Sequence, residues 1–165
     1  MKKKLFYSAI ALLIIIVDQL TKAWMVANLK GHENIVWIKN VFELEYLENQ
    51  GAAFSSFLGK QTFLLIITSI ILAFAIFEFV RIPATKRFAW LHLSFAFLIA
   101  GAIGNMIDRI KQGYVVDFFY FVPVDFPRFN VADIFITICV PILVILLFFV
   151  YKNDEVDFLF KFKKS

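Results

Sequence analysis

Four long apolar runs constrain this chain more than any other feature of its sequence. They cover about residues 5–27, 62–80, 88–107 and 131–151. A helix needs about 20 mostly apolar residues to cross the hydrocarbon core of a bilayer, and each run is close to that length. One soluble globule of 165 residues has too little interior to bury all four runs. The sequence therefore predicts an all-α membrane protein with four transmembrane helices, folded as a single membrane-embedded domain over residues 1–165.

Composition excludes the soluble classes of protein. Hydrophobic residues make up 61% of the chain and charged residues only 18%, whereas roughly 25% of a typical soluble protein is charged. A soluble enzyme, a disordered tail and a fibrous protein are all inconsistent with these values. The net charge of +4 does not indicate a nucleic-acid partner, because the basic residues lie at the ends of the apolar runs.

The basic residues also predict how the chain is oriented. Clusters of lysine and arginine precede the first run, link the second run to the third and follow the fourth. An even number of crossings places these three regions on one side, and the positive-inside rule makes that side cytoplasmic. Both termini are then cytoplasmic, and the connections at about 28–61 and 108–130 face outward. The clustered basic residues are Lys2, Lys3, Lys4, Arg81, Lys86, Arg87, Lys152, Lys161, Lys163 and Lys164.

The first run also has features of a secretory signal peptide. Lysines at positions 2–4 precede an apolar stretch at positions 5–17. No convincing small-x-small cleavage site follows that stretch, which instead passes into a polar segment beginning at Asp18 and then resumes. We therefore expect a retained helix.

The two outward connections carry patterns of their own. In the first connection, apolar and acidic residues alternate over positions 42–46, and Lys39 and Asn40 are suited to a turn. This pattern predicts a small outward-facing amphipathic β-sheet at about 33–58, lying on the membrane surface. The second connection contains an apolar run from Tyr114 to Val122 that is too short to span. We expect that run to dip into the interface or to pack against the ends of the helices.

Polar residues lie near or just beyond the outer ends of three of the four runs. A charged side chain deep in a bilayer costs about 2.5–3.5 kcal/mol to insert, so such residues usually face a protein interior. Asp18 and Lys22 are four positions apart, which places them on one helix face where they can pair. A purely structural role is the alternative, since Asn130 and Asp133 have the spacing of a helix cap. The full set is Asp18, Lys22, Asn105, Asp108, Arg109, Asp117, Asn130 and Asp133.

Asp117 and Asp133 have the surroundings of a catalytic pair. Each is flanked on both sides by apolar residues, and poor solvation of a carboxyl group favours its protonated form. Two such groups placed together cannot easily both ionise, so one serves as acid and the other as base. That pair can activate a water molecule on a peptide carbonyl and then protonate the leaving nitrogen. The arrangement requires the connection between the two residues to fold back.

Other functions have weaker support in the sequence. A proton-coupled carrier or channel subunit would need acidic residues distributed through the membrane depth. A non-catalytic scaffold would use the polar groups only to hold helices together. Ser55 and Ser56 have no histidine near them in the sequence to activate a nucleophile, and Cys139 belongs to no cluster with metal-ligand spacing. We therefore expect no metal site.

Five motifs carry a resemblance to a known family. They are DQLTK at 18–22, NQGAAF at 49–54, GNMIDR at 104–109, VVDFF at 115–119 and FNVAD at 129–133. In this order, and over four apolar runs, they resemble the lipoprotein signal peptidase (signal peptidase II) family of bacterial intramembrane aspartyl proteases. The sequence VAD stands here where IAD is common in the family, which is a conservative change.

The resemblance implies an activity, partners and a location. A member of this family is an aspartic endopeptidase that removes the signal peptide from a diacylglyceryl-modified prolipoprotein, cutting just before the lipidated cysteine. It lies among the lipids of the bacterial cytoplasmic (inner) membrane as a multi-pass protein, with its active site toward the outer leaflet. It needs no cofactor, and globomycin-type cyclic peptides are expected to inhibit it.

The resemblance also implies site residues. Asp117 and Asp133 match the family's catalytic dyad. From their chemistry, we expect Asn49 to bind the substrate backbone and Gly51 to let that backbone approach closely. We expect Asn105 and Asn130 to orient the dyad, and the pairs Asp18–Lys22 and Asp108–Arg109 to hold helices together. The supporting residues are Asp18, Lys22, Asn49, Gly51, Asn105, Asp108, Arg109 and Asn130.

Overall fold

Four long helices form the body of the molecule. The computed structural model describes residues 2–51 and 61–160. The helices are α1 (Lys2–Leu29), α2 (Gln61–Arg81), α3 (Ala89–Gln112) and α4 (Val131–Ile145). A π-helical turn, η3 (Leu146–Val150), continues α4. By length and composition, α1, α2, α3 and the segment Val131–Val150 are each able to cross a membrane.

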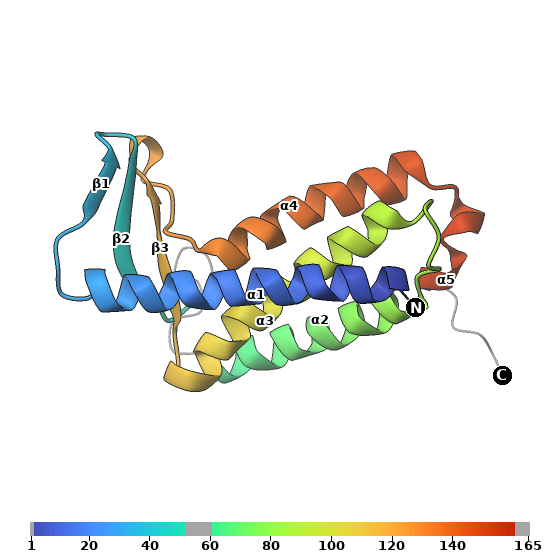
Figure 1. Ribbon diagram of the computed structural model, residues 1–165, viewed down its shortest axis with the longest axis horizontal. Coiled ribbons are helices and arrows are strands. Elements are labelled where there is room, and N and C mark those ends of the chain that lie inside the picture. Colours follow the sequence, from blue (N-terminus) through green and yellow to red (C-terminus); the bar gives the residue numbers. More distant parts are fainter. Residues whose placement is uncertain (1, 52–60, 161–165) are drawn as a thin grey trace.

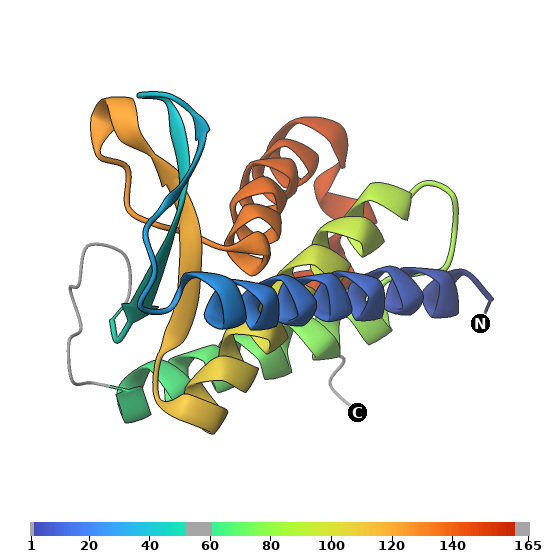
Figure 2. The ribbon, with the colours of Figure 1, turned by 60° about the vertical axis from the view of Figure 1, so that its left-hand side comes forward.

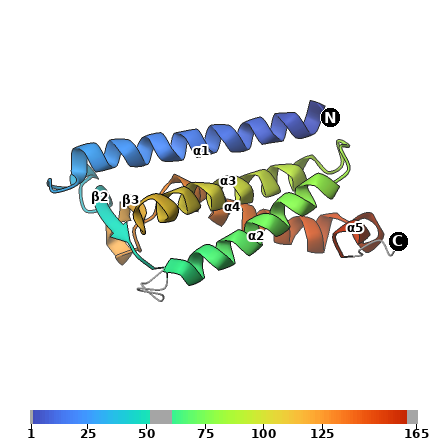
Figure 3. The ribbon, with the colours of Figure 1, turned by 90° about the horizontal axis from the view of Figure 1, so that it is seen from below.

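Helix α3 lies at the centre of the bundle. It contacts α1, α2 and α4, as seen in Figures 1 and 3. Its buried residues include Leu91, Phe95 and Ala100, which belong to the main apolar cluster of the molecule. The outward surfaces of the other helices expose large apolar side chains such as Ile70 and Phe148. Such a surface suits lipid rather than water.

Two glycines let α4 approach α3 closely. A Cβ atom added at Gly101 would lie 2.6 Å from the Ala132 carbonyl oxygen. One added at Gly104 would lie 2.6 Å from Asp18 Oδ2. Small residues at helix contacts allow this approach in membrane bundles. The missing side chains at these two positions therefore allow α1, α3 and α4 to pack closely together.

A three-stranded antiparallel sheet caps one end of the bundle. The strands are β1 (Ile35–Ile38), β2 (Phe42–Asn49) and β3 (Val115–Phe121), in the order β1-β2-β3. Asn40 lies in the turn between β1 and β2 with a φ angle of 61°, in the left-handed region that Asn tolerates. The predicted small sheet is thus confirmed. Residues 52–58 of the segment in which we expected it lie outside the described residues.

Strand β3 confirms one of the two alternatives expected for the apolar run that begins at Tyr114, because the strand packs against the end of α1. That the run forms a strand was not expected, and most of it pairs with β2 from Phe42↔Phe121 to Asn49↔Val115. This pairing uses backbone groups of β3 that need hydrogen-bond partners at the membrane boundary. The sheet therefore joins both outward connections into one layer. Short elements complete the chain: η2 (Val122–Val124), η4 (Asn153–Glu155) and α5 (Asp157–Phe160).

The two ends of the bundle differ in what they carry. The sheet meets the last turns of α1 and the start of α4 at one end, here called the site end (Figures 1 and 2). An apolar cluster that includes Met25, Leu29, Val116 and Phe118 packs β3 against α1 there. The start of α1, the α2–α3 connection and α5 lie at the opposite end, here called the terminal end.

Candidate active site

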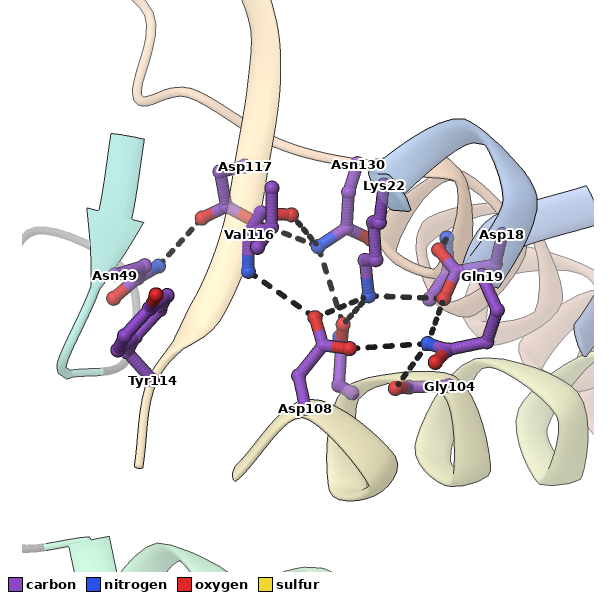
Figure 4. A network of polar contacts seen from close by, with 12 residues as sticks. Asp18, Gln19, Lys22, Asn49, Gly104, Asp108, Tyr114, Val116, Asp117 and Asn130 are labelled. Carbon is purple, nitrogen blue, oxygen red and sulfur yellow. Dashed lines mark hydrogen bonds and ion pairs between the residues drawn. The ribbon is translucent and has the colours of Figure 1, made fainter. Parts of the chain in front are cut away.

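Asp117 lies on β3 with its carboxyl group inside the protein. Only 1% of its surface is exposed. Its Oδ2 accepts a hydrogen bond from Asn49 Nδ2 at 2.7 Å, and its Oδ1 accepts one from Asn130 Nδ2 at 2.6 Å (Figure 4). Strand β2 and the segment before α4 thus each supply one amide to this carboxyl.

Asp133 lies at the third position of α4 and takes part in a capping box. Its backbone N–H donates to Asn130 Oδ1 at 3.0 Å, and the backbone N–H of Asn130 donates to Asp133 Oδ2 at 3.2 Å. The other carboxyl oxygen, Oδ1, accepts from Asn105 Nδ2 at 2.8 Å. The capping role considered for this pair is therefore real, and it coexists with a link to α3.

Asn130 connects the two aspartates. Its Nδ2 donates to Asp117 Oδ1 and also to Asn105 Oδ1, the latter at 3.1 Å. Its Oδ1 accepts from the backbone of Asp133. The preceding residue, Phe129, pairs through its backbone with Phe119 of β3. The fold-back between Asp117 and Asp133 that the sequence required is therefore present.

The surroundings of Asp117 change its acidity. Burial, together with the nearby charge of Asp133, raises the pKa of Asp117 to about 7. The amide donors of Asn49 and Asn130 act the other way, because they stabilise the ionised carboxylate. The Asp117 carboxyl therefore changes its protonation close to neutral pH, where an acid–base pair is useful.

A buried lysine holds the helices around the two aspartates. Only 3% of Lys22 is exposed, and its ammonium contacts Asp18 Oδ2 at 2.9 Å, Asp108 Oδ2 at 3.1 Å and Asn105 Oδ1 at 2.9 Å. The predicted Asp18–Lys22 pair is thus present. All three protons of the ammonium have acceptors, which is what a buried lysine needs.

The same two carboxylates reach the backbone next to each aspartate. Asp18 Oδ1 accepts from the backbone N–H of Ala132 at 2.9 Å, in the first turn of α4. Asp108 Oδ2 accepts from the backbone N–H of Val116 at 3.1 Å, one residue before Asp117. One ion-pair cluster therefore positions both the strand and the helix that carry the aspartates.

Sequence reasoning missed two members of this cluster. Gln19 Nε2 donates to Asp108 Oδ1 at 3.0 Å and to the Gly104 carbonyl at 3.2 Å (Figure 4). Gly104 leaves the space that the Asp18 carboxylate occupies. Both residues belong to quoted motifs, so the only signal for them was their place next to Asp18 and Asn105.

One expected contact differs in the structure. The Asp108–Arg109 pair is not formed, because adjacent residues on a helix point in different directions and Asp108 binds Lys22 and Gln19 instead. Within residues 2–51 and 61–160, Arg109 Nε is buried without a hydrogen-bond partner.

Asn49 stays a predicted substrate contact, and the structure shows that its amide also bonds within the protein. Its Nδ2 donates to Asp117, and its Oδ1 accepts from the backbone N–H of Gly51 at 3.0 Å. Both ends of this amide are thus used inside the protein, and Gly51 is buried beside it. The neighbouring positions 52–56, which include Ser55 and Ser56, lie outside the described residues.

The polar cluster is not arranged as a metal site. In the part of the chain that the structure describes, no group of three or more His, Cys, Asp or Glu side chains is placed to hold a metal ion. The carboxylates of Asp18 and Asp108 instead surround the Lys22 ammonium. The chemistry available here is that of two carboxyl groups in a protein interior, supported by amides and one lysine.

Known proteins match this chain over most of its length. The family model described as signal peptidase (SPase) II matches residues 10–149. A lipoprotein signal peptidase of Lactococcus lactis subsp. lactis is 43% identical over 137 residues, covering 82% of this chain and 89% of the relative. One of Clostridium tetani is 44% identical over 149 residues, covering 88% and 92%.

Solved structures match as well. A bacterial membrane enzyme solved by the in meso method at 2.3 Å is 32% identical, with a TM-score of 0.77 over 97% of this chain and 93% of that chain. A second, at 1.9 Å, is 33% identical with a TM-score of 0.75, covering 88% and 94%. Sequence, fold and motifs therefore agree that the chain belongs to the lipoprotein signal peptidase (signal peptidase II) family of membrane proteases.

Proposed function

We propose that this chain is an intramembrane aspartyl endopeptidase that removes the signal peptide from diacylglyceryl-modified prolipoproteins. The cut falls just before the lipidated cysteine. The observation that carries the proposal is the joining of Asp117 and Asp133 in one hydrogen-bond network through Asn130 and Asn105. The relatives named lipoprotein signal peptidases support the substrate class.

The dyad works by sharing one proton. The ionised carboxyl group takes a proton from a water molecule as the water oxygen attacks the carbonyl carbon of the scissile bond. The protonated carboxyl group gives its proton to the carbonyl oxygen, so that a neutral tetrahedral diol forms. A proton then passes to the leaving nitrogen, the C–N bond breaks and the diol becomes the new carboxyl group. The pKa of about 7 at Asp117 keeps such a shared proton available near neutral pH.

The remaining polar residues position the dyad. Asn105 and Asn130 fix the two carboxyl groups, and Asn49 with Gly51 fixes Asp117 from the side of the sheet. The cluster of Asp18, Lys22 and Asp108 holds β3 and α4 at the right separation through the backbone groups that these carboxylates bind.

Arg109 has a different role in this scheme. It interacts electrostatically with Asp133 and Asp117, so its charge favours the state in which one of them is ionised. This role requires no direct ion pair with either carboxyl group.

The same proposal places the protein in the bacterial cytoplasmic membrane with both termini in the cytoplasm. Exposed Lys2, Lys3, Lys86 and Lys152 at the terminal end support this orientation. The dyad then lies toward the outer leaflet, where the acyl chains of a substrate remain in lipid. Globomycin-type peptides are expected to bind at the dyad.

A proton-coupled carrier is disfavoured by the distribution of acidic residues. Along helices α1–α4 as described, the acidic residues are Asp18, Glu78, Asp108 and Asp133. Three of them belong to the site end, and Glu78 at the other end is paired with Arg81. No acidic residue of these helices lies between the two groups to continue a proton path.

Cleavage of a diacylglyceryl-modified prolipoprotein by purified protein in detergent or lipid tests the proposal. Wild type is compared with Asp117→Asn and Asp133→Asn, and an unlipidated precursor serves as the substrate control. We expect cleavage of the lipidated precursor only, and a loss of about 10²–10⁴-fold in each variant because general acid–base catalysis is removed. Mass spectrometry of the products locates the cut.

A matched acidic residue controls for the loss of charge. Asp125 lies in the connection between the two aspartates, and its side chain is 79% exposed. It accepts hydrogen bonds from Tyr120 and Arg128 at the surface. Asp125→Asn should cleave close to the wild-type rate. A folded Asp117→Asn or Asp133→Asn variant that cleaves at the normal rate would overturn the dyad assignment.

A further inference from the structure

A cavity of about 250 Å³ lies at the terminal end, far from the dyad. Figure 3 shows the start of α1 beside the α2–α3 connection, and the cavity lies between these two segments. Lysines from both segments line it, together with aromatic side chains of α1 and a hydroxyl of the connection. These residues are Lys2, Lys3, Phe6, Tyr7, Thr85 and Lys86.

The three lysines of this cavity have no anionic partner among the described residues. Lys2, Lys3 and Lys86 are all exposed, and in the described part of the chain none of them forms an ion pair with a carboxylate. Because like charges gathered around one cavity repel each other, this arrangement favours a bound anion.

Neighbouring cations at the same end are engaged elsewhere. The Lys4 ammonium donates to the Val80 carbonyl at the end of α2. Arg87 forms an ion pair with Glu155 at 2.9 Å, and its guanidinium also lies over the ring of Tyr151. Lys4 and Arg87 are therefore not available to a ligand in the way that the three cavity lysines are.

The cavity also has an apolar flank. Phe6 is 61% exposed, and Leu5 beside it is 72% exposed. Tyr7 forms a fixed wall, because its ring stacks on buried His92 with centroids 5.1 Å apart. Ala89 begins α3 at the edge of the cavity, and no side chain caps that helix, so the positive end of its dipole adds to the field there.

We propose that this cavity binds the phosphate group of a phospholipid with a net negative headgroup. The three ammonium groups surround the phosphate, the Thr85 hydroxyl donates to it, and an acyl chain lies along Phe6 and Leu5. A basic pocket between transmembrane helices at the headgroup level is the setting in which anionic lipids are recognised. A soluble phosphate ion would meet the same lysines but would leave the apolar flank unused.

Titration of the full-length protein in a neutral detergent tests this site. The probe is short-chain phosphatidylglycerol, and the comparison ligands are short-chain phosphatidylcholine and inorganic phosphate. Bound lipid is counted by native mass spectrometry, and its affinity is measured by calorimetry. We expect one saturable binding site for phosphatidylglycerol, with much weaker binding of the other two ligands.

Charge-matched variants locate the site. Each surface lysine is worth about 5-fold in affinity for an anionic lipid, so the Lys2→Gln/Lys3→Gln/Lys86→Gln variant should lose on the order of 100-fold. The three corresponding Lys→Arg changes should retain binding. The control Lys39→Gln/Lys111→Gln/Lys152→Gln removes three other exposed lysines and should bind within about 3-fold of wild type.

Folding and activity are measured on the same samples. The cavity variant should keep its unfolding midpoint and its cleavage rate in detergent, since none of its changes touches the dyad network. Equal binding by wild type and the cavity variant would overturn the proposal. So would equal affinity for phosphatidylcholine, which would indicate a general lipid surface, or for inorganic phosphate, which would indicate an ion site.

Discussion

The two ends of the helical bundle differ in how completely their buried polar groups are hydrogen-bonded. At the site end the buried side chains bond to one another and to the backbone of β3 and α4. At the terminal end, Glu78 and His92 are also buried, yet Glu78 Oε2 and His92 Nε2 have no hydrogen-bond partner in the described structure. The bonded residues at the site end are Asp18, Lys22, Asn105, Asp108, Asp117 and Asn130.

This difference shows which end depends on its polar groups. The loss of a buried charge that bonds three partners removes a contact from each of them. A buried ring with one unpartnered nitrogen leaves almost nothing unsatisfied. Substitutions of buried polar residues should therefore change stability and cleavage strongly at the site end and only slightly at the terminal end. Arg109 Nε and Gln61 Oε1 are exceptions at the site end, because neither atom has a hydrogen-bond partner among the described residues.

The largest effect should come from Lys22→Met. The change leaves the carboxylates of Asp18 and Asp108 buried without their cation. Breaking a buried ion pair by removing one partner costs about 3–5 kcal/mol. We expect a strongly lowered unfolding midpoint in detergent, measured by tryptophan fluorescence. We also expect loss of cleavage.

Lys30→Met is the matched control for that change. Lys30 pairs with Glu48 at 2.8 Å, but its side chain is 51% exposed, so water replaces the lost partner. Its unfolding midpoint should stay close to that of wild type. If Lys22→Met were as stable as Lys30→Met, the ion-pair cluster would not hold the site end together.

A smaller effect should follow from Gly104→Ala. The added Cβ would lie 2.6 Å from Asp18 Oδ2, so α3 and α1 must separate or the carboxylate must move. Overpacking of this kind costs about 1–3 kcal/mol. Because Asp18 also holds the first turn of α4, the cleavage rate should fall together with the unfolding midpoint.

Ile110→Ala tests whether any change on α3 has the same result. Ile110 is 68% exposed on the same helix, so its side chain is not part of the buried polar cluster. Cleavage by this variant should remain near the wild-type rate. A Gly104→Ala protein with unchanged cleavage and stability would mean that the close approach of α1 and α3 is not required.

Hydropathy was sufficient to predict the helices but not the full sheet. A run of about 20 apolar residues predicts a spanning helix by itself, without knowledge of what the rest of the chain contacts. The run from Val115 to Phe121 is apolar at almost every position, so its periodicity does not separate a strand from a buried helical turn. Its pairing with β2 depends on a partner more than 60 residues earlier, as the contact between Asn49 and Val115 shows.

The candidate site divides in the same way. Spacing on one helix predicted the Asp18–Lys22 pair, which is a local contact. Spacing did not predict that Asp108 would also contact Lys22, because that contact joins two helices. The role of Gln19 was hidden for the same reason, since its partners Asp108 and Gly104 lie on α3.

A subtler effect at the site end concerns pH. Asn49 Nδ2 stabilises the ionised form of Asp117 and so opposes the rise of its pKa to about 7. Asn49→Ala removes that donor and should raise the pKa further. Cleavage needs one proton on the dyad and declines as that proton is lost at high pH. The alkaline limb of the pH–rate profile should therefore move to higher pH, by on the order of one unit.

Tyr46→Phe provides the comparison on the same strand. Its hydroxyl donates to Glu48 and not to Asp117, so the alkaline limb should stay in place. Rates are measured across the pH range at saturating lipidated precursor. A limb that moves to lower pH in Asn49→Ala would contradict the assigned role, because the amide would then be stabilising the protonated carboxyl.

The smallest effect should come from the terminal end, in His92→Phe. His92 is 1% exposed, and its ring stacks on Tyr7 and meets Phe79 edge-on, contacts that a phenylalanine ring can keep. Its Nδ1 lies 3.1 Å from the Phe88 carbonyl, whose helical bond from the His92 backbone N–H remains after the change.

His92→Phe also removes the unpartnered Nε2, and removing an unsatisfied buried polar atom is neutral or stabilising. The unfolding midpoint should therefore stay equal or rise, with cleavage within about 2-fold of wild type. A folded His92→Phe protein with cleavage reduced more than about 10-fold would show that the two ends are coupled, and the contrast between them would fail.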